Sequence, residues 1–237
     1  DSSFVTFNLL YNLQKKINCE FYAVIGITNQ SKKFFIEQNF VKFKKIWFYF
    51  DHVNCSKTVT DENYLVGFEQ RHKINLWEMA INERIFYRFN TFHKFTSDEI
   101  LSILEQECKL FENIINEINP DFCIIKEIDQ HKDELFVKIC RSKNIPVLSA
   151  CPTKLVNRYI ISQEFNKFDT NLELSKVKNQ GRTFEELREY LHNTSDFSKL
   201  QKNATKFLNS KTQKIKAGIK FFLQSNTNIE THYTYFG

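Results

Sequence analysis

The residues best suited to chemistry are two carboxylates and an imidazole in the stretch 127–131. Glu127, Asp129 and His131 can serve as general bases or bind sugar hydroxyl groups. A structural interpretation competes with this one, because Asp129 can cap a helix and Lys126 can neutralise Glu127. His131 would then lie in a first helical turn, which is normally exposed. We keep Glu127, Asp129 and His131 as catalytic candidates and favour the structural interpretation.

A second set of candidates follows from position in the chain. In open α/β sheets, ligands bind beyond the carboxyl ends of the strands, where loops and helix N-termini bring unpaired N–H groups together. Applied to the strands predicted below, this rule selects five further polar residues as candidates for substrate binding: Asn29, Asp51, His52, Thr153 and Arg158.

Several common site motifs are missing. The five glycines are too scattered for a dinucleotide-binding or Walker phosphate loop, and the GxSxG and HExxH motifs do not occur. The six cysteines include no CxxC pair and no zinc-ligand spacing, so we expect reduced thiols and no metal site.

The stretch 120–152 must position the first candidates, and it predicts a strand, a helix and a strand. Residues 121–125 and 145–149 are short apolar runs typical of buried strands. Between them, apolar residues recur at the spacing of one buried helical face: Leu135, Phe136, Ile139 and Cys140. This pattern predicts a right-handed βαβ unit.

Residues 3–50 predict an alternation of helix, strand, helix and strand, with the strands near 21–27 and 45–50. A doubly wound sheet usually begins with a strand, and here that strand would precede Asp1. We therefore predict the α/β class, with a Rossmann-like parallel sheet flanked by helices and its first strand apparently missing. The start without Met also suggests a fragment.

The middle of the chain predicts helices. Aromatic and basic residues alternate over 62–95, a composition that can bind single-stranded nucleic acid or simply pack two helices, and we favour packing. Residues 96–99, Thr-Ser-Asp-Glu, form a capping box that opens a long amphipathic helix to about Ile118.

We predict a boundary near Gly181, which separates a Rossmann-like lobe at 1–180 from a helical segment at 181–237. A second capping box at 183–186 opens a short helix. The long predicted helix 199–222 contains seven lysines and no acid. It can lie on an anionic membrane surface or pack as a solvated helix, and we favour the solvated helix.

Composition indicates the expected location and partners. No apolar run approaches a membrane span, and no secretory pattern opens the chain, so we expect a cytoplasmic protein with the lysine-rich helix as its one route to membrane contact. Subtracting the seven lysines from the net charge of +5 leaves −2 elsewhere, which disfavours nucleic acid as a partner.

The segments "EINPDFCII" and "LFVKICRSKNIPVLSACPTKLVNRYI" resemble the N-terminal half of GT-B-type glycosyltransferases of surface or capsular polysaccharide synthesis. "RTFEELREYL" and "ETHYTYFG" are similar to the segment that leads toward the second half of such proteins. The resemblance implies the acceptor-side lobe of a two-lobed transferase. It also implies a glycan or lipid-linked acceptor, no cofactor bound by this lobe, and a nucleotide-sugar donor held mainly by an absent second lobe.

Two functions therefore remain open from the sequence. The first is a glycosyltransferase lobe that we do not expect to act alone, because the resemblance implies that the donor is held mainly by a second lobe. The alternative is a non-catalytic α/β module that binds a polyanion or nucleic acid through the aromatic and basic stretch and the seven lysines, with binding that falls steeply as salt rises.

Overall fold

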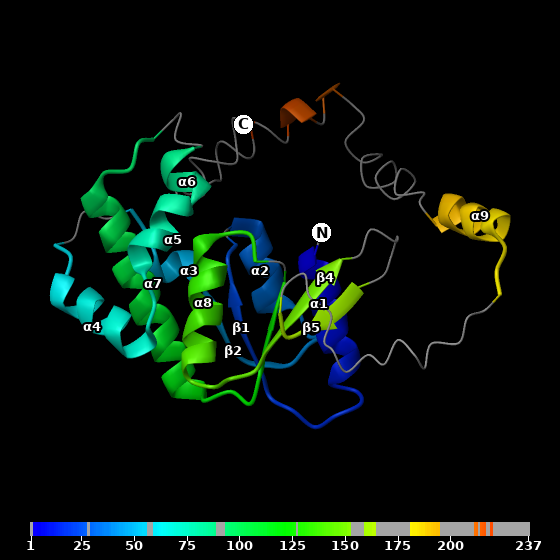
Figure 1. Ribbon diagram of the computed structural model, residues 1–237, viewed down its shortest axis with the longest axis horizontal. Helices are drawn as coiled ribbons and strands as arrows, with labels where there is room; N and C mark the ends of the chain where they lie inside the picture. The colour runs from blue at the N-terminus through cyan, green and yellow to red at the C-terminus, as the bar shows by residue number, and fades with distance from the viewer. Residues whose placement is uncertain are drawn as a thin grey trace. The chain divides into compact units, whose positions relative to one another are not determined.

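The computed structural model describes residues 2–27, 29–55, 59–88, 93–126, 128–152, 159–164 and 181–194, and a few positions between 211 and 219 (Figure 1). Helices and strands alternate at its start and again around β3, α8 and β4, with a run of helices between them, so the chain belongs to the α/β class. It divides into two compact units, one reaching to Val147 and the other beginning at Leu148. Among the described helices, none has the length and apolar character needed to cross a membrane.

The first unit opens with α1 (Ser2–Leu13), β1 (Phe21–Ile25), α2 (Asn29–Glu37) and β2 (Phe43–Phe48). The predicted alternation of helix, strand, helix and strand is confirmed. β1 and β2 pair in parallel, with Tyr22 opposite Lys45 and Ile25 opposite Phe48. Both strands therefore end at the same edge, which we call the carboxyl edge.

The predicted strand, helix and strand of residues 120–152 are also confirmed, as β3 (Cys123–Ile125), α8 (His131–Ser142) and β4 (Val147–Pro152). The backbone N–H of Cys123 donates to the carbonyl of Pro146 at 2.9 Å. β5 (Tyr159–Ser162) pairs antiparallel with β4, in a sheet of order β3-β4-β5. The described strands thus form two small sheets, whereas we expected one continuous parallel sheet.

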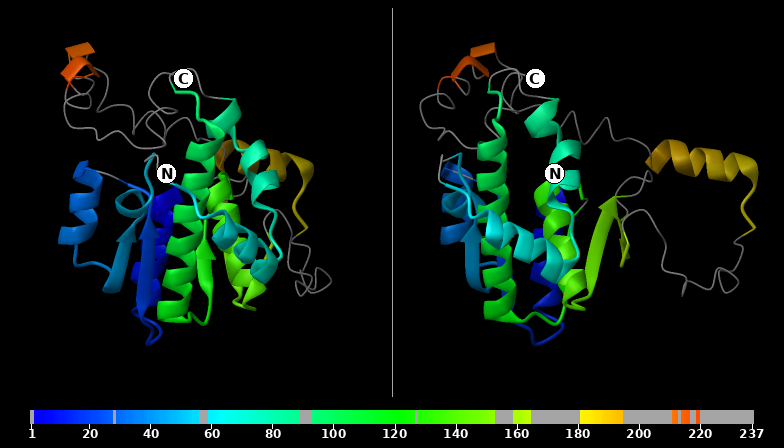
Figure 2. Two further views of the ribbon diagram at one scale, coloured as in Figure 1. Left: turned by 90° about the vertical axis from the view of Figure 1, so that its left-hand side faces the viewer. Right: turned by 60° about the vertical axis from the view of Figure 1, so that its left-hand side comes forward.

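The longest described helix, α7 (Ser97–Ile118), packs against α3 (Tyr49–His52), α4 (Glu62–His72) and α8 (Figures 1 and 2). Its predicted capping box is present: the Thr96 hydroxyl accepts from the N–H of Glu99, whose carboxylate accepts from the N–H of Thr96. Asn119 ends the helix in the left-handed region at φ 46°. Both ends of α7 are therefore set by local sequence.

The aromatic and basic stretch forms α4, α5 (Leu76–Asn82) and α6 (Arg84–Tyr87), three helices where two were predicted. Side-chain caps explain the extra helix. Asn75 accepts from the N–H of Glu78 to start α5, and Glu83 accepts from the N–H of Ile85 to start α6. Apolar residues of the three helices are buried against α7 and α8: Leu65, Phe68, Leu76, Met79, Ile85 and Phe86.

In the second unit, α9 (Phe184–Thr194) begins at the second predicted capping box. The N–H of Thr183 donates to the Glu186 carboxylate at 2.8 Å, and the N–H of Glu186 donates to the Thr183 hydroxyl at 3.3 Å. Most of the predicted lysine-rich helix 199–222 lies outside the described residues. Within it, Lys211, Lys214 and Lys216 are described and exposed.

Candidate functional site

Three segments of the first unit meet around the side chain of Lys132, in the first turn of α8. The Lys132 ammonium lies 4.6 Å from the ring centroid of Tyr49 and 5.5 Å from that of Phe50, just after β2. A methyl group added at Gly26, just after β1, would lie 3.5 Å from the same ammonium and 3.9 Å from the Phe50 ring. The carboxyl ends of β1 and β2 therefore converge with the start of α8.

A second lysine lies at the carboxyl edge beside a predicted site residue. The ammonium of Lys32, on α2, donates to both oxygens of the Asp51 carboxylate at 2.7 and 2.6 Å. It also lies 4.7 Å from the ring centroid of Phe48, the last residue of β2. The side chain of Asp51 is half exposed, so this carboxylate remains in contact with solvent.

The N-terminus of α8 is not capped by the residue that the sequence predicted. The N-cap residue is Gln130, whose side chain makes no capping bond, and Asp129 precedes it. The prediction that Asp129 caps this helix was wrong. Instead, the Asp133 carboxylate accepts from the backbone N–H groups of Asp129 and Gln130, and burial raises the pKa of Asp133. Asp129 pairs with Arg84, which donates to its carboxylate at 2.7 Å and to its carbonyl at 3.0 Å.

His131 lies in the interior, whereas a first-turn residue was expected to be exposed. Its Nδ1 is 2.7 Å from a Glu83 carboxylate oxygen that also accepts from the His131 backbone N–H at 2.7 Å. Its Nε2 is 2.9 Å from Oε1 of Glu107, which also accepts from the Tyr49 hydroxyl. The ring contacts Phe86 at a centroid distance of 5.0 Å. We call His131, Glu83, Glu107 and Tyr49 the buried acid–histidine network.

In this network the two carboxylates stabilise the positive charge of His131, and His131 stabilises the negative charge of Glu83. Burial acts to lower the pKa of His131, but the adjacent carboxyl groups of Glu107 and Glu83 outweigh burial and raise it to about 10. Burial acts to raise the pKa of Glu83, but the hydrogen bonds and charge of His131 outweigh it and lower this pKa to about 2. At neutral pH both ring nitrogens of His131 therefore donate, and the ring has no free lone pair for use as a general base.

Sequence reasoning did not identify Glu83 or Glu107, which lie 48 and 24 residues from His131. One signal was available for Glu107, because it lies on the apolar stripe of α7, three residues after Leu104 and four before Phe111. A carboxylate on a buried stripe needs a partner. The network joins α3, α7, α8 and the α5–α6 junction, so it fixes Tyr49 beneath Lys132.

The other predicted site residues are placed as follows. His52 is the exposed last residue of α3, next to Asp51. Asn29 is the first residue of α2, and its side chain is not described. Glu127, Thr153 and Arg158 lie outside the described residues. The structure thus brings Asp51 to the carboxyl edge with Lys32, and Asp129 to the start of α8 with Arg84.

A second polar cluster, which sequence reasoning missed, joins α4, α7 and α8. His72 Nδ1 is 2.6 Å from the Ser142 hydroxyl, and its Nε2 is 2.8 Å from the Glu112 carboxylate. Serine, imidazole and carboxylate in a row are the groups of a hydrolase triad. However, the Ser142 hydroxyl also lies 2.8 Å from the carbonyl of Ile139, and Glu112 also accepts from the hydroxyl of Tyr64 at 2.7 Å. We interpret this cluster as a structural link at the C-terminal end of α8, away from the carboxyl edge.

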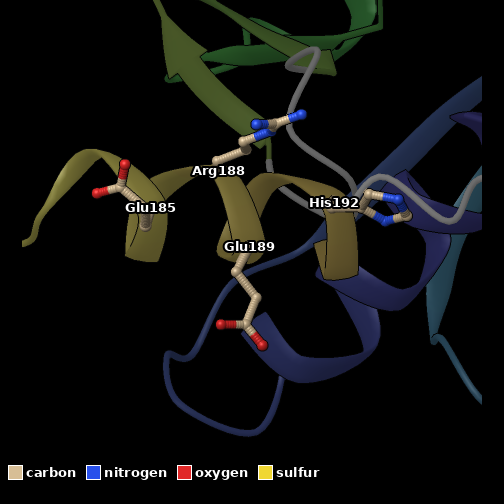
Figure 3. A pocket seen from close by; sticks show the side chains of 4 residues that line it. All are labelled: Glu185, Arg188, Glu189 and His192. Atoms are coloured by element: carbon tan, nitrogen blue, oxygen red, sulfur yellow. The ribbon is translucent and has the colours of Figure 1, made fainter.

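An open surface depression lies on α9 in the second unit (Figure 3). The side chains of Arg188 and Glu189 point in different directions in this view. The depression is lined by residues of one exposed helix: Glu185, Arg188, Glu189 and His192. Ligand sites are normally concave and bury most of the ligand, so this surface is a poor candidate. Within the described part of the chain, no three His, Cys, Asp or Glu side chains are grouped to hold a metal ion.

Comparisons of the chain with models of known protein families, with curated protein sequences and with solved structures found no match. The α/β class therefore rests on the observed strands and helices alone. The carboxyl edge, with Gly26, Tyr49, Phe50, Asp51 and Lys132, is the candidate site that the geometry supports best.

Proposed function

We propose that this chain is the acceptor-side lobe of a glycosyltransferase of surface polysaccharide synthesis and binds the acceptor glycan at the carboxyl edge. The observation that carries the proposal is the convergence of the segments after β1 and β2 with the start of α8 around Lys132. In open α/β sheets this is the position where ligands bind. The sequence resemblance to GT-B-type transferases supplies the reaction class.

The side chains at this edge suit a carbohydrate. Ligand sites combine aromatic surface with a few placed polar groups, and the half-buried ring of Phe50 lies beside the Lys132 ammonium. The carboxylates of Asp51 and Asp129, whose side chains are 50% and 65% exposed, can accept hydrogen bonds from sugar hydroxyl groups. Lys32 and Lys132 can donate to ring oxygens or to an acidic sugar. The buried acid–histidine network keeps Tyr49 and the start of α8 in position.

Acceptor binding can be tested directly with the full chain on an array of surface-polysaccharide oligosaccharides, followed by calorimetric titration of a glycan that binds. Loss of a hydrogen bond to a charged group costs about 1.5–3 kcal/mol, so Asp51→Asn or Lys132→Gln should weaken binding about 10- to 100-fold. The matched control is Lys138→Gln, six residues further along α8, where the lysine pairs with Glu134 of the same helix at 2.8 Å. This control should bind like the wild type.

Three results would count against the proposal. Binding that is equally weakened by Lys138→Gln would show that the carboxyl edge is not the site. Tight binding of a nucleotide sugar by this chain would contradict its assignment as the acceptor side. Binding of heparin, with no glycan specificity and a steep fall as salt rises, would favour a polyanion-binding module instead.

A further inference from the structure

Two cysteine thiols of the first unit lie in contact, outside the carboxyl edge. The Sγ atoms of Cys123, on β3, and Cys140, in the last turns of α8, are 3.7 Å apart. The S–S bond of a disulfide is about 2.05 Å, so the two sulfurs would have to approach by roughly 1.7 Å. β3 has three residues, all of them half-buried, so a small displacement of this short strand would expose or disrupt little of the core.

The two thiols have different surroundings. Cys140 is fully buried, while Cys123 is only partly buried. The contact with the Cys140 thiol lowers the pKa of Cys123 against the opposing effect of burial, and the same contact and burial raise the pKa of Cys140. Because Cys123 is the more exposed of the two thiols, it is the one that a peroxide reaches first, and Cys140 is placed to react second.

We propose that Cys123 and Cys140 form a reversible disulfide site that responds to peroxide. The Cys123 thiolate attacks one oxygen of hydrogen peroxide, the O–O bond breaks, and hydroxide leaves with a Cys123 sulfenic acid formed. The Cys140 sulfur then attacks the Cys123 sulfur, the S–O bond breaks, and the thiol proton of Cys140 leaves with the hydroxyl group as water. A dithiol reductant reverses the reaction.

The disulfide would close a loop of chain that contains candidate residues of the first unit. Cys123 and Cys140 are 17 positions apart, and the segment between them contains Asp129, His131 and Lys132. Oxidation would therefore tie β3 to α8 across the segment that forms one side of the carboxyl edge.

The site can be tested on the full chain by adding hydrogen peroxide, blocking free thiols with N-ethylmaleimide and mapping peptides by mass spectrometry without reduction. We expect a peptide pair joined through Cys123 and Cys140 as the main product, which disappears after treatment with dithiothreitol. Cys55 is the internal control, because it is also partly buried but burial raises its pKa to about 11. It should be oxidised at least about tenfold more slowly than Cys123.

Two variants separate the roles of the thiols. In Cys140→Ser the Cys123 sulfenic acid should accumulate and be trapped by dimedone, whereas in Cys123→Ser the thiol of Cys140 should stay unmodified. If Cys140→Ser does not fold, the peptide map of the wild-type chain decides. Oxidation of Cys123 no faster than Cys55, or a main product that joins a different pair of cysteines, would overturn the proposal.

Discussion

Replacement of Glu107 by glutamine tests the buried acid–histidine network most directly. The amide can keep an oxygen in place to accept from the Tyr49 hydroxyl and from His131, but it removes the negative charge beside the imidazolium. Breaking a buried ion pair by removal of one partner costs about 3–5 kcal/mol. The other oxygen of Glu107 is buried and has no hydrogen-bond partner among the described residues, so the neutral amide relieves part of an existing cost. We therefore expect the free energy of unfolding to fall by about 3 kcal/mol, the lower end of that range.

The pH dependence of the unfolding free energy shows whether this loss comes from the charge on His131. The pKa of His131 is raised in the folded chain from the ordinary value of 6.5 to about 10, so its stabilising effect is complete below pH 6.5 and is lost as pH rises through 10. Because Glu107→Gln brings the pKa of His131 closer to its ordinary value, the difference in unfolding free energy between wild type and variant should shrink over this interval. On the acid side, the pKa of Glu83 is lowered from 4.5 to about 2, so its contribution is present above pH 4.5 and is lost as pH falls through 2.

The assay is urea unfolding followed by circular dichroism at several values from pH 5, below the ordinary pKa of 6.5 for histidine, up to pH 10, near the raised pKa of His131. The control is Glu117→Gln, also on α7, whose carboxylate binds Lys45 at 2.6 Å with both side chains about half exposed. An exposed pair of this kind contributes about 1 kcal/mol or less. If Glu107→Gln costs no more than this control, or if its curve runs parallel to that of the wild type above pH 6.5, the description of His131 as a buried imidazolium is wrong.

Three further predictions concern stability. Thr96→Ala removes one half of the capping box of α7 and should cost about 1 kcal/mol by urea unfolding, with Thr96→Ser close to wild type. Leu104→Ala leaves a cavity at a fully buried position and should cost about 2–5 kcal/mol, while Ile81→Ala at an exposed position of α5 should change little. Glu112→Gln weakens the acceptor shared by His72, Tyr64 and Arg71 and should cost about 2 kcal/mol, whereas a triad role for Ser142 would instead appear as labelling by a fluorophosphonate probe. Labelling of Ser142 would contradict the structural interpretation of that cluster.

Local features of the fold could be predicted from the sequence. The capping boxes at Thr96 and Thr183 depend on contacts within four residues, and both are present. The strand, helix and strand of 120–152 follow from apolar runs and helical spacing, and they too are present. The arrangement of the strands could not be predicted in the same way, because pairing depends on distant segments. The described strands form two small sheets, an arrangement that the local sequence pattern does not specify.

The candidate site could also be predicted from the sequence only in part. The rule on strand ends selected Asp51 and Asp129, and the structure places the segment after β2 beside Lys132 at the start of α8; the role of these residues in binding stays a prediction. It did not identify Lys132 or Lys32, and it gave no account of the burial of His131. The partners of His131 come from the α5–α6 junction and from the middle of α7, so only the packed structure brings them together.

The central claim is that the carboxyl edge binds an acceptor glycan, and an NMR titration of the ¹⁵N-labelled chain with a glycan selected on the array tests it most directly. The account predicts that the largest shifts in backbone amide signals occur at Gly26, Phe50, Asp51, Asp129 and Lys132, with little change near Ser142 at the other end of α8. Shifts concentrated near Ser142 or on α9, or a glycan panel that leaves every amide signal in place, would contradict it.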